Sequence, residues 1–320
     1  MPDSRLKASV IISTHNGATR ILKTLFSLTK QTMKDFEIIV VDNASTDNTK
    51  EVVQGAKKDI ACLQYVFEPN LGISAARNKG FQISKGEVIL FMDDDEIASP
   101  GWVHEHVKVY GSNKNIDAIG GRIILKWTSL RPGWLPRKIN RRMGCLNLGV
   151  HARPMIFPEY PFGGNMSFRR NIFKQLKGFS LTFGIKGCGL MGNEEKEIFF
   201  RLNQLNPRHI VQYSPEAYVH HTINAKRLSQ KNIIMRNFYQ GVSDVLFTEL
   251  TESPRRSRIR WLKRSLRGYV SVFQTFFPIF KFRIKKKETK LFMMQISCAY
   301  WLGYARECLK FCLINKNNKK

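Results

Sequence analysis

Residues 87–102 read EVILFMDDDEIASPGW, in which an apolar run leads directly into Asp93, Asp94, Asp95 and Glu96. The apolar run predicts a buried strand that ends at these carboxylates, which repel one another unless a cation lies near them. In an extended segment residues i and i+2 point the same way, so Asp93 and Asp95 can converge while Asp94 faces elsewhere. A hard divalent cation such as Mg²⁺ or Mn²⁺ prefers such oxygen ligands. A solvated acidic turn is the alternative for this motif taken alone.

The residues before this motif alternate β-branched runs with helical patterns, which indicates a parallel α/β sheet. Strands are expected over 8–14, 35–42, 63–67 and 87–95, and helices over 18–32, 45–58 and 72–84. Sheets of this kind bind ligands at the carboxyl ends of their strands. The polar residues that follow each strand are therefore candidates for a binding site.

Two further strand ends carry such residues. Thr14, His15 and Asn16 follow the first strand, and Asp42 ends the second. A carboxylate at this place can accept hydrogen bonds from a base or a ribose. The alternatives are an Asx turn or helix cap at Asp42, with Ser45 as the expected cap of the next helix, and a structural histidine.

The pattern becomes less regular after residue 97. A helix is expected over 99–110 and a strand over 117–125, followed by a loop over 126–144 rich in Trp, Pro and Arg. A loop of this length inside a compact domain indicates a functional role. The segment 192–205, GNEEKEIFFRLNQL, predicts a helix that opens on an acidic turn, and the residues after 225 are helical and increasingly basic.

Taken in order, SVIISTHNG, EIIVVDNASTD, EPNLGISAARNKG and EVILFMDDDEIASPGW resemble the nucleotide-diphospho-sugar glycosyltransferases of family 2. The resemblance continues through FGGNMSFRR, GNEEKEIFFRL and VHHTINAKR, and so covers roughly residues 8–240. It implies the GT-A fold, a mixed and mainly parallel sheet flanked by helices. It also implies a catalytic domain over 1–240, with a nucleotide-binding half over about 1–97 and an acceptor-binding half over about 98–240, before a basic, aromatic, helical tail over 241–320.

The same resemblance implies an inverting transferase. The expected donor is a nucleotide-diphospho-sugar, a UDP-sugar first, and the expected acceptor is a hydroxyl on a glycan or a lipid-linked saccharide. The resemblance assigns the nucleotide-sugar to Thr14, His15, Asn16, Asp42, Arg77, Asp93, Asp94 and Asn165, and a divalent metal, Mg²⁺ or Mn²⁺, to Asp95, Asp93 and His221. The family's DXD motif, two Asp separated by one residue, matches Asp93 and Asp95. Because the residue between them is also Asp, any of the three can be a ligand. A surface salt bridge for Arg77 and a core position for His221 are the alternatives.

A transferase of this kind needs a carboxylate that takes the proton of the acceptor hydroxyl. The family's acidic pair matches Glu194 and Glu195, and we expect Glu195 to be the base, with Glu194 as the second candidate. Glu in a first helical turn is also favoured by the helix dipole, by about 0.3–1 kcal/mol, without any catalysis. Glu197 is expected to pair with Arg201, four residues later.

The composition gives the chain a large basic excess. Its 320 residues include 52 Lys and Arg against 25 Asp and Glu, a net charge of +27, of which +15 lies in residues 251–320. Hydrophobic residues make up 43% of the chain, which excludes a wholly disordered basic protein. In residues 255–287 the cations alternate with aromatic residues, namely Trp261, Tyr269, Phe273, Phe276, Phe277, Phe280 and Phe282.

Such a tail suits an anionic membrane surface or a nucleic acid. We expect a membrane surface, contacted through residues about 255–290, because the run GYVSVFQTFFPIF is more apolar than RNA binding requires. A solvated basic face is the third possibility. The N-terminus lacks the apolar run of a signal peptide and no window reaches about 18 apolar residues. Six Cys without metal spacing also suit a reducing compartment.

The expected location is therefore cytoplasmic and peripheral, on the inner face of the cell membrane. Two other classes of protein remain open from the sequence. A basic nucleic-acid-binding protein is supported by the charge alone, without a recognisable reading module. A catalytically inactive GT-A scaffold would keep the fold and lose the chemistry.

Overall fold

The computed structural model describes residues 6–185, 190–223, 228–252, 258–276 and 287–314. The chain divides into two compact units. The first unit comprises Met1–Trp127, Lys138–Thr182 and Glu194–Ile223. The second comprises Thr128–Arg137, Phe183–Asn193 and Asn224–Lys320.

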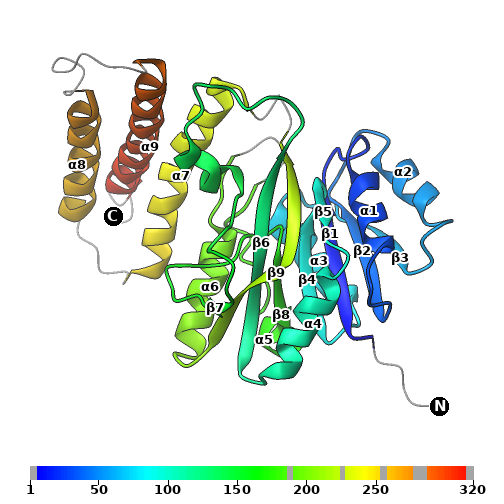
Figure 1. The fold of residues 1–320 in the computed structure, drawn as a ribbon. Coiled ribbons are helices and arrows are strands. Elements are labelled where there is room, and N and C mark those ends of the chain that lie inside the picture. Colours follow the sequence, from blue (N-terminus) through cyan, green and yellow to red (C-terminus); the bar gives the residue numbers. More distant parts are fainter. Residues whose placement is uncertain (1–5, 186–189, 224–227, 253–257, 277–286, 315–320) are drawn as a thin grey trace. The chain divides into compact units, whose positions relative to one another are not determined.

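The first unit is built on one mixed sheet flanked by helices (Figure 1). Its strands are β1 (Ala8–Thr14), β2 (Phe36–Asp42), β3 (Leu63–Phe67), β4 (Val88–Asp93), β5 (Glu96–Ala98), β6 (Ile116–Trp127), β7 (Arg153–Pro154), β8 (Met166–Arg169) and β9 (Ile210–Ile223). Its helices are α1 (Ile21–Thr29), α2 (Thr49–Ala56), α3 (Ile73–Ile83), α4 (Trp102–Ser112), α5 (Arg170–Gln175) and α6 (Glu194–Leu205). The 3₁₀ helix η1 (Arg137–Met143) follows β6 in the chain.

The strand order in this sheet is β3-β2-β1-β4-β8-β6-β9-β5, and β7 pairs with β9. The first four strands are parallel, whereas β8 joins β4 to β6 in antiparallel pairing. The long strand β9 then runs parallel to β6. The predicted α/β fold, a mixed and mainly parallel sheet flanked by helices, is confirmed.

The central strands are buried on both faces. All seven residues of β2 are buried, and so are six of the seven residues of β1. A strand covered on both faces needs a continuous apolar run rather than an alternating one, which is what FEIIVVD and ASVIIST supply. This is why their position and direction could be predicted from the sequence.

Several local boundaries differ from the sequence prediction, and for two of them the contacts show why. Helix α2 begins at Thr49 and not near Ser45, because the Ser45 hydroxyl accepts the Asn16 N–H at 2.9 Å and the Ser45 N–H donates to the Asp42 carboxylate at 3.0 Å. Strand β4 ends at Asp93, and the acidic residues after it form a turn into the short strand β5, which pairs with β9.

The second unit contains three long helices. They are α7 (Gln230–Thr251), α8 (Arg258–Phe276) and α9 (Lys287–Ile314). A small core joins them around Val245, Trp261 and Cys308. No helix in the described ranges is both long and apolar enough to cross a bilayer. The helical prediction for the residues after 225 is confirmed for these ranges, and residues 255–257 and 277–286 of the expected membrane contact lie outside them.

Candidate active site

The carboxyl ends of three neighbouring strands lie together at one edge of the sheet. In the parallel register Thr14 on β1 faces Asp42 on β2, and Ser13 on β1 faces Asp93 on β4. The strand order therefore gathers the polar strand ends that the sequence placed far apart. This is the edge where open α/β sheets bind ligands.

Asp94 is held inside the protein rather than left free at this edge. The Thr14 hydroxyl donates to Asp94 Oδ2 at 2.5 Å, and Arg20 Nε donates to Oδ1 at 2.7 Å. Burial raises the pKa of Asp94, and Arg20 opposes this rise. The Thr24 hydroxyl donates to the Asp94 carbonyl at 2.9 Å and so fixes the turn itself. Sequence reasoning missed Arg20, because nothing in its local pattern points to a partner 74 residues away.

The buried guanidinium of Arg77, on α3, joins the acidic turn to the acidic pair. Its terminal nitrogens lie 3.3 Å from Asp93 Oδ1, 3.4 Å from Glu194 Oε1 and 3.7 Å from Glu195 Oε1. Burial alone would lower the pKa of Arg77, but the charges of Glu195, Asp93 and Glu194 outweigh it and the pKa is raised. Arg77 is thus a buried cation shared by three carboxylates, and not a surface salt bridge.

The two members of the acidic pair have different surroundings. Burial first, and then the charge of Glu195, raise the pKa of Glu194 to about 8, while Arg77 opposes the rise. The Glu194 side chain is 6% exposed and that of Glu195 is 19% exposed. Glu195 Oε1 also accepts the N–H of Gly163 at 3.0 Å. Glu195 is therefore the more accessible carboxylate, held by one backbone donor and one shared cation.

Gly163 permits this approach. A Cβ at this position would collide with the Arg77 guanidinium and the Glu195 carboxylate. The glycine pair of FGGN therefore serves contacts within the protein, since a Cβ at Gly164 would likewise collide with the Glu96 carboxylate.

Asp95 and His221 form a second cluster beside the turn. His221 Nδ1 lies 3.3 Å from Asp95 Oδ1 and 3.6 Å from Glu96 Oε1. Burial raises the pKa of Glu96 to about 7, while hydrogen bonding to His221 opposes the rise. The pairing of β5 with β9 produces this cluster, because Glu96 faces His221 in the register. Sequence reasoning missed Glu96, since β5 is too short to show a pattern of its own.

Within the described ranges, no group of three or more His, Cys, Asp or Glu is arranged so that it could hold a metal ion. Carboxylates and a neutral imidazole are ligand types that suit Mg²⁺ or Mn²⁺, and these ions usually keep positions for water and substrate phosphates. Asp93, Asp95 and His221 therefore have suitable chemistry, while their role as metal ligands stays a prediction.

Asn165 lies in the core of the unit. Its Nδ2 donates to the carbonyls of Arg122 at 3.0 Å and Ala217 at 2.8 Å, and its Oδ1 accepts from Trp102 Nε1 at 2.8 Å. The same oxygen lies 3.1 Å from His106 Nε2. Burial lowers the pKa of His106 to about 4, so this ring is neutral. Asn165 is fully buried, so its role toward a sugar stays a prediction for which these contacts offer no support.

Asp42 is buried at the end of β2. Tyr65 OH donates to its Oδ2 at 2.8 Å, and the Ser45 N–H donates to its Oδ1. Burial and the hydrogen bond to Asp42 both raise the pKa of Tyr65. Each carboxylate oxygen can accept a further hydrogen bond.

The loop after β1 packs against the loop after β2. Asn16 Oδ1 accepts the Thr46 N–H at 2.8 Å, and His15 Nδ1 lies 2.7 Å from the Asn43 carbonyl. The structure therefore brings Thr14, Asn16 and Asp42 to one sheet edge, while their contacts with a nucleotide stay predictions.

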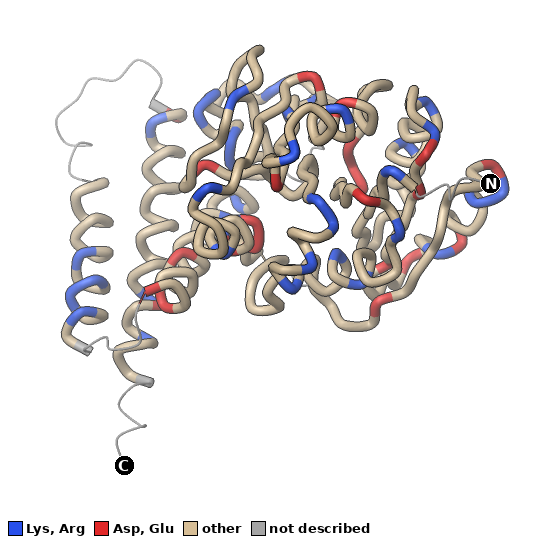
Figure 2. Tube along the Cα trace, turned by 90° about the horizontal axis from the view of Figure 1, so that it is seen from below, with Lys and Arg blue, Asp and Glu red and all other residues tan. Residues whose placement is uncertain are grey.

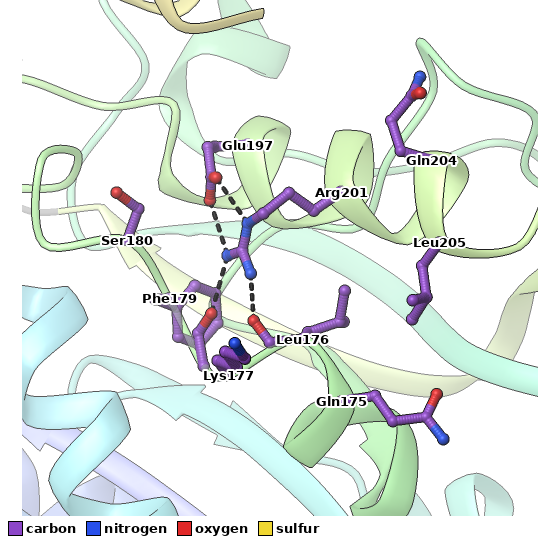
Figure 3. Close-up of a pocket in the computed structure, with 10 residues that line it drawn as sticks. Gln175, Leu176, Lys177, Phe179, Ser180, Glu197, Arg201, Gln204 and Leu205 are labelled. Carbon is purple, nitrogen blue, oxygen red and sulfur yellow. Dashed lines mark hydrogen bonds and ion pairs between the residues drawn. The ribbon is translucent and has the colours of Figure 1, made fainter.

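A hollow of about 580 Å³ lies at the other end of α6, between that helix and the segment after α5 (Figure 3). Arg201 at its centre donates to Glu197 Oε1 at 2.6 Å and to Oε2 at 2.8 Å. It also donates to the carbonyls of Leu176 and Gly178. The predicted Glu197–Arg201 pair is confirmed, and these two charges compensate one another. Lys177 also lines the hollow.

The sequence profile described as Glycosyl transferase family 2 matches residues 9–177, which is more than half of the chain. The chain belongs to this family. It is therefore a transferase, and the matched residues include β1 to β4 and the acidic turn.

Two curated relatives illustrate the range of similar enzymes. The glucosyl-dolichyl phosphate glucuronosyltransferase of Haloferax volcanii is 26% identical over 259 residues, which covers 77% of this chain and 80% of the relative. The GalNAc(5)-diNAcBac-PP-undecaprenol β-1,3-glucosyltransferase of Campylobacter jejuni is 39% identical over 92 residues, which covers 28% of this chain and 30% of that enzyme. The second match is thus confined to under a third of either protein.

Among solved structures, the mannosyltransferase PcManGT of Pyrobaculum calidifontis, in complex with GDP-Man and Mn²⁺, aligns with a TM-score of 0.60. The alignment covers all of this chain and 90% of that structure, at 17% sequence identity. At this identity the likeness establishes the GT-A fold and nothing finer.

Proposed function

We propose that this family 2 enzyme is an inverting glycosyltransferase that uses a nucleotide-diphospho-sugar and transfers the sugar to a hydroxyl of a glycan or a lipid-linked saccharide. The observation that carries the proposal is the buried Arg77, which connects Asp93 to the acidic pair Glu194 and Glu195. This arrangement puts a cation for a diphosphate and a carboxylate for an acceptor proton in one cluster.

The roles of the chain's own residues follow from their surroundings. Arg77 stabilises negative charge that moves to the leaving diphosphate and keeps the Glu195 carboxylate oriented. Glu195 takes the acceptor proton, because it is the more exposed of the two acids. Glu194 is largely protonated near pH 7, since its pKa is about 8, and it acts as a neutral neighbour that limits repulsion.

Asp93, Asp95 and His221 are the proposed ligands of a divalent ion. Such an ion would neutralise the diphosphate as the glycosidic bond breaks. The Mn²⁺ bound by the mannosyltransferase of Pyrobaculum calidifontis supports this choice. Asp94 is expected to support the turn from behind, because both of its oxygens are already engaged by Thr14 and Arg20.

The donor base is open between uracil and guanine. A UDP-sugar was the first expectation from the sequence, whereas the similar mannosyltransferase binds GDP-Man. Asp42, with its remaining acceptor positions, can receive an N–H from either base. The two curated relatives are named for a dolichyl phosphate and an undecaprenol-linked saccharide, which supports a polyprenyl-linked acceptor and hence activity at a membrane surface.

The test is a panel of UDP- and GDP-sugars incubated with Mn²⁺, with release of the nucleoside diphosphate as the readout. One donor should be consumed, and Asp95→Ala should abolish its consumption. Glu195→Gln should lower kcat on the order of 10²–10⁴-fold and leave donor binding intact. Glu216→Gln, an exposed glutamate on β9, is the matched control and should keep full activity.

Two outcomes would contradict the proposal. If no donor is consumed and Asp95→Ala changes nothing, the chain is an inactive scaffold or acts on another partner. If Glu195→Gln keeps full activity while Glu194→Gln loses it, the base is Glu194.

A further inference from the structure

One face of α8 is used for packing within the second unit. Trp261 stacks on Phe311 of α9 with ring centroids 5.4 Å apart, and the Ser265 hydroxyl donates to the Ala305 carbonyl at 3.0 Å. A Cβ at Gly268 would lie against Ala305, so the helices approach closely there. The spacing of Trp261, Ser265 and Gly268 places all three on one side of the helix.

A second face of α8 is apolar and exposed. Its residues recur every three or four positions and are Ile259, Leu262, Leu266, Val270 and Phe273. Phe273 is 76% exposed and Ile259 is 63% exposed. A helical stripe of this kind is what normally faces a core, yet this stripe faces solvent.

A third face is basic. Arg260, Lys263 and Arg267 are exposed, and α8 contains no Asp or Glu, as Figure 2 shows at the left by blue segments without red ones. Within the described ranges these three cations have no ion-pair partner, whereas Arg264 pairs with Glu252 at 3.2 Å. With 3.6 residues per turn, the basic stripe is centred roughly 100° from the apolar stripe.

The two stripes meet around a small hollow of about 350 Å³. Its lining residues are Ile259, Arg260, Lys263, Arg264 and Arg267. Unpaired cations around a hollow attract an anion the size of a phosphate group. A phosphate held there would be next to the apolar stripe.

We infer that this exposed face of α8 lies in the headgroup layer of an anionic lipid bilayer, with its apolar stripe toward the acyl chains and its basic stripe on lipid phosphates. An interfacial helix needs this pairing of an apolar face with Lys and Arg beside it. The membrane contact depends on the proposed function in one respect only: it would bring the enzyme to a lipid-linked acceptor.

The chemistry of the stripe favours lipid over the two other occupants. Nucleic-acid binding of this type uses aromatic rings that stack on bases, and four of the five exposed residues of the stripe are aliphatic. Trp261, which the sequence suggested as a stacking ring, is fully buried. A second copy of the chain would bring like charges together beside the stripe.

Two variants test the two stripes separately. R260Q/K263Q/R267Q removes three charges, and L262S/L266S/F273S removes three apolar side chains. All six residues are exposed, so the thermal midpoint should stay close to that of the unaltered chain. K23Q/K57Q/K58Q removes three exposed charges from α1 and the end of α2 and is the matched control.

The full chain and each variant are floated with vesicles of phosphatidylcholine alone or with added phosphatidylglycerol. The full chain and the control should float with the anionic vesicles only. The charge variant should partition about 100-fold less, because each cation near an anionic surface contributes about fivefold. The stripe variant should lose binding to a similar extent.

Equal flotation of the full chain and both α8 variants would overturn the inference, as would failure of the full chain to float. If single-stranded RNA is bound and released by R260Q/K263Q/R267Q while flotation is unchanged, the face binds nucleic acid. Donor consumption is measured in the same preparations with a water-soluble acceptor saccharide, and the α8 variants should retain it. If no preparation consumes the donor, the full chain included, while the full chain still floats with anionic vesicles, the proposed function is refuted and the membrane contact stands.

Discussion

At the residue scale, the contacts of Asn165 distinguish a structural role from a binding role. Asn165→Ala removes the partners of two backbone carbonyls and of the Trp102 indole, all buried. We expect the free energy of unfolding to fall by about 3 kcal/mol, measured by urea denaturation. Asn115→Ala, at an exposed position, is the control. Unchanged stability together with a raised donor KM would show instead that Asn165 acts on the sugar.

The raised pKa of Glu194 gives a pH-dependent prediction. The folded protein keeps the Glu194 proton up to about pH 8, whereas the unfolded chain releases it near the ordinary value of 4.5. The unfolded state therefore binds fewer protons between these pH values, and the free energy of unfolding falls as pH rises through this window. Glu194→Gln has no proton to release at this position and so lacks this fall in stability. The free energy of unfolding of Glu194→Gln, relative to that of the unaltered chain, should therefore increase from pH 5 to pH 8.

Urea denaturation at pH 5, 6, 7 and 8 measures this difference. The exposed Glu216→Gln serves as the control, and its curve should run parallel to that of the unaltered chain. A constant difference between Glu194→Gln and the unaltered chain across the window would mean that Glu194 is ionised in the folded protein. Its part in the acidic pair would then have to be revised.

At the element scale, the sequence predicted the elements whose pattern is local. Strands β1, β2 and β4 are largely apolar runs because they are buried on both faces, and their order brings Thr14, Asp42 and Asp93 to one edge. Strand β5 could not be predicted, since its three residues depend on pairing with β9. The same holds for the site: the acidic residues stand out in the sequence, but Arg20 becomes visible as a partner of Asp94 only once the chain has folded.

The helices of the second unit hold the segment that leads into α6. Asp244 on α7 accepts from Asn193 Nδ2 at 3.0 Å and from Tyr300 OH at 2.9 Å, and the Gly192 N–H donates to Ser243 Oγ at 3.2 Å. Asn193, which has a positive φ of 75°, directly precedes Glu194 in the chain. Asp244 therefore ties the segment before α6 to α7 and α9 within the second unit.

Asp244→Ala removes the acceptor of the Asn193 amide and of the Tyr300 hydroxyl, and should lower the free energy of unfolding by about 2 kcal/mol, measured by urea denaturation. Asp244→Asn keeps one acceptor oxygen and should restore part of this stability. Thr251→Ala, whose hydroxyl bonds only within α7, is the control on the same helix. Equal stability of Asp244→Ala and the unaltered chain would show that these contacts do not stabilise the second unit.

At the scale of the whole molecule, the proposed membrane contact and the proposed sugar transfer should differ in their sensitivity to salt. The cations of α8 are exposed, whereas Arg77 is 2% exposed and enclosed by carboxylates. Raising the ionic strength from 0.1 to 1 M shortens the screening length from about 10 Å to about 3 Å, which weakens exposed charges much more than buried ones. Binding to anionic vesicles should then fall by about 100-fold, the contribution of three cations. Transfer to a water-soluble acceptor should change far less. A parallel fall of binding and transfer, measured by flotation and by nucleoside diphosphate release, would mean that one set of charges serves both activities.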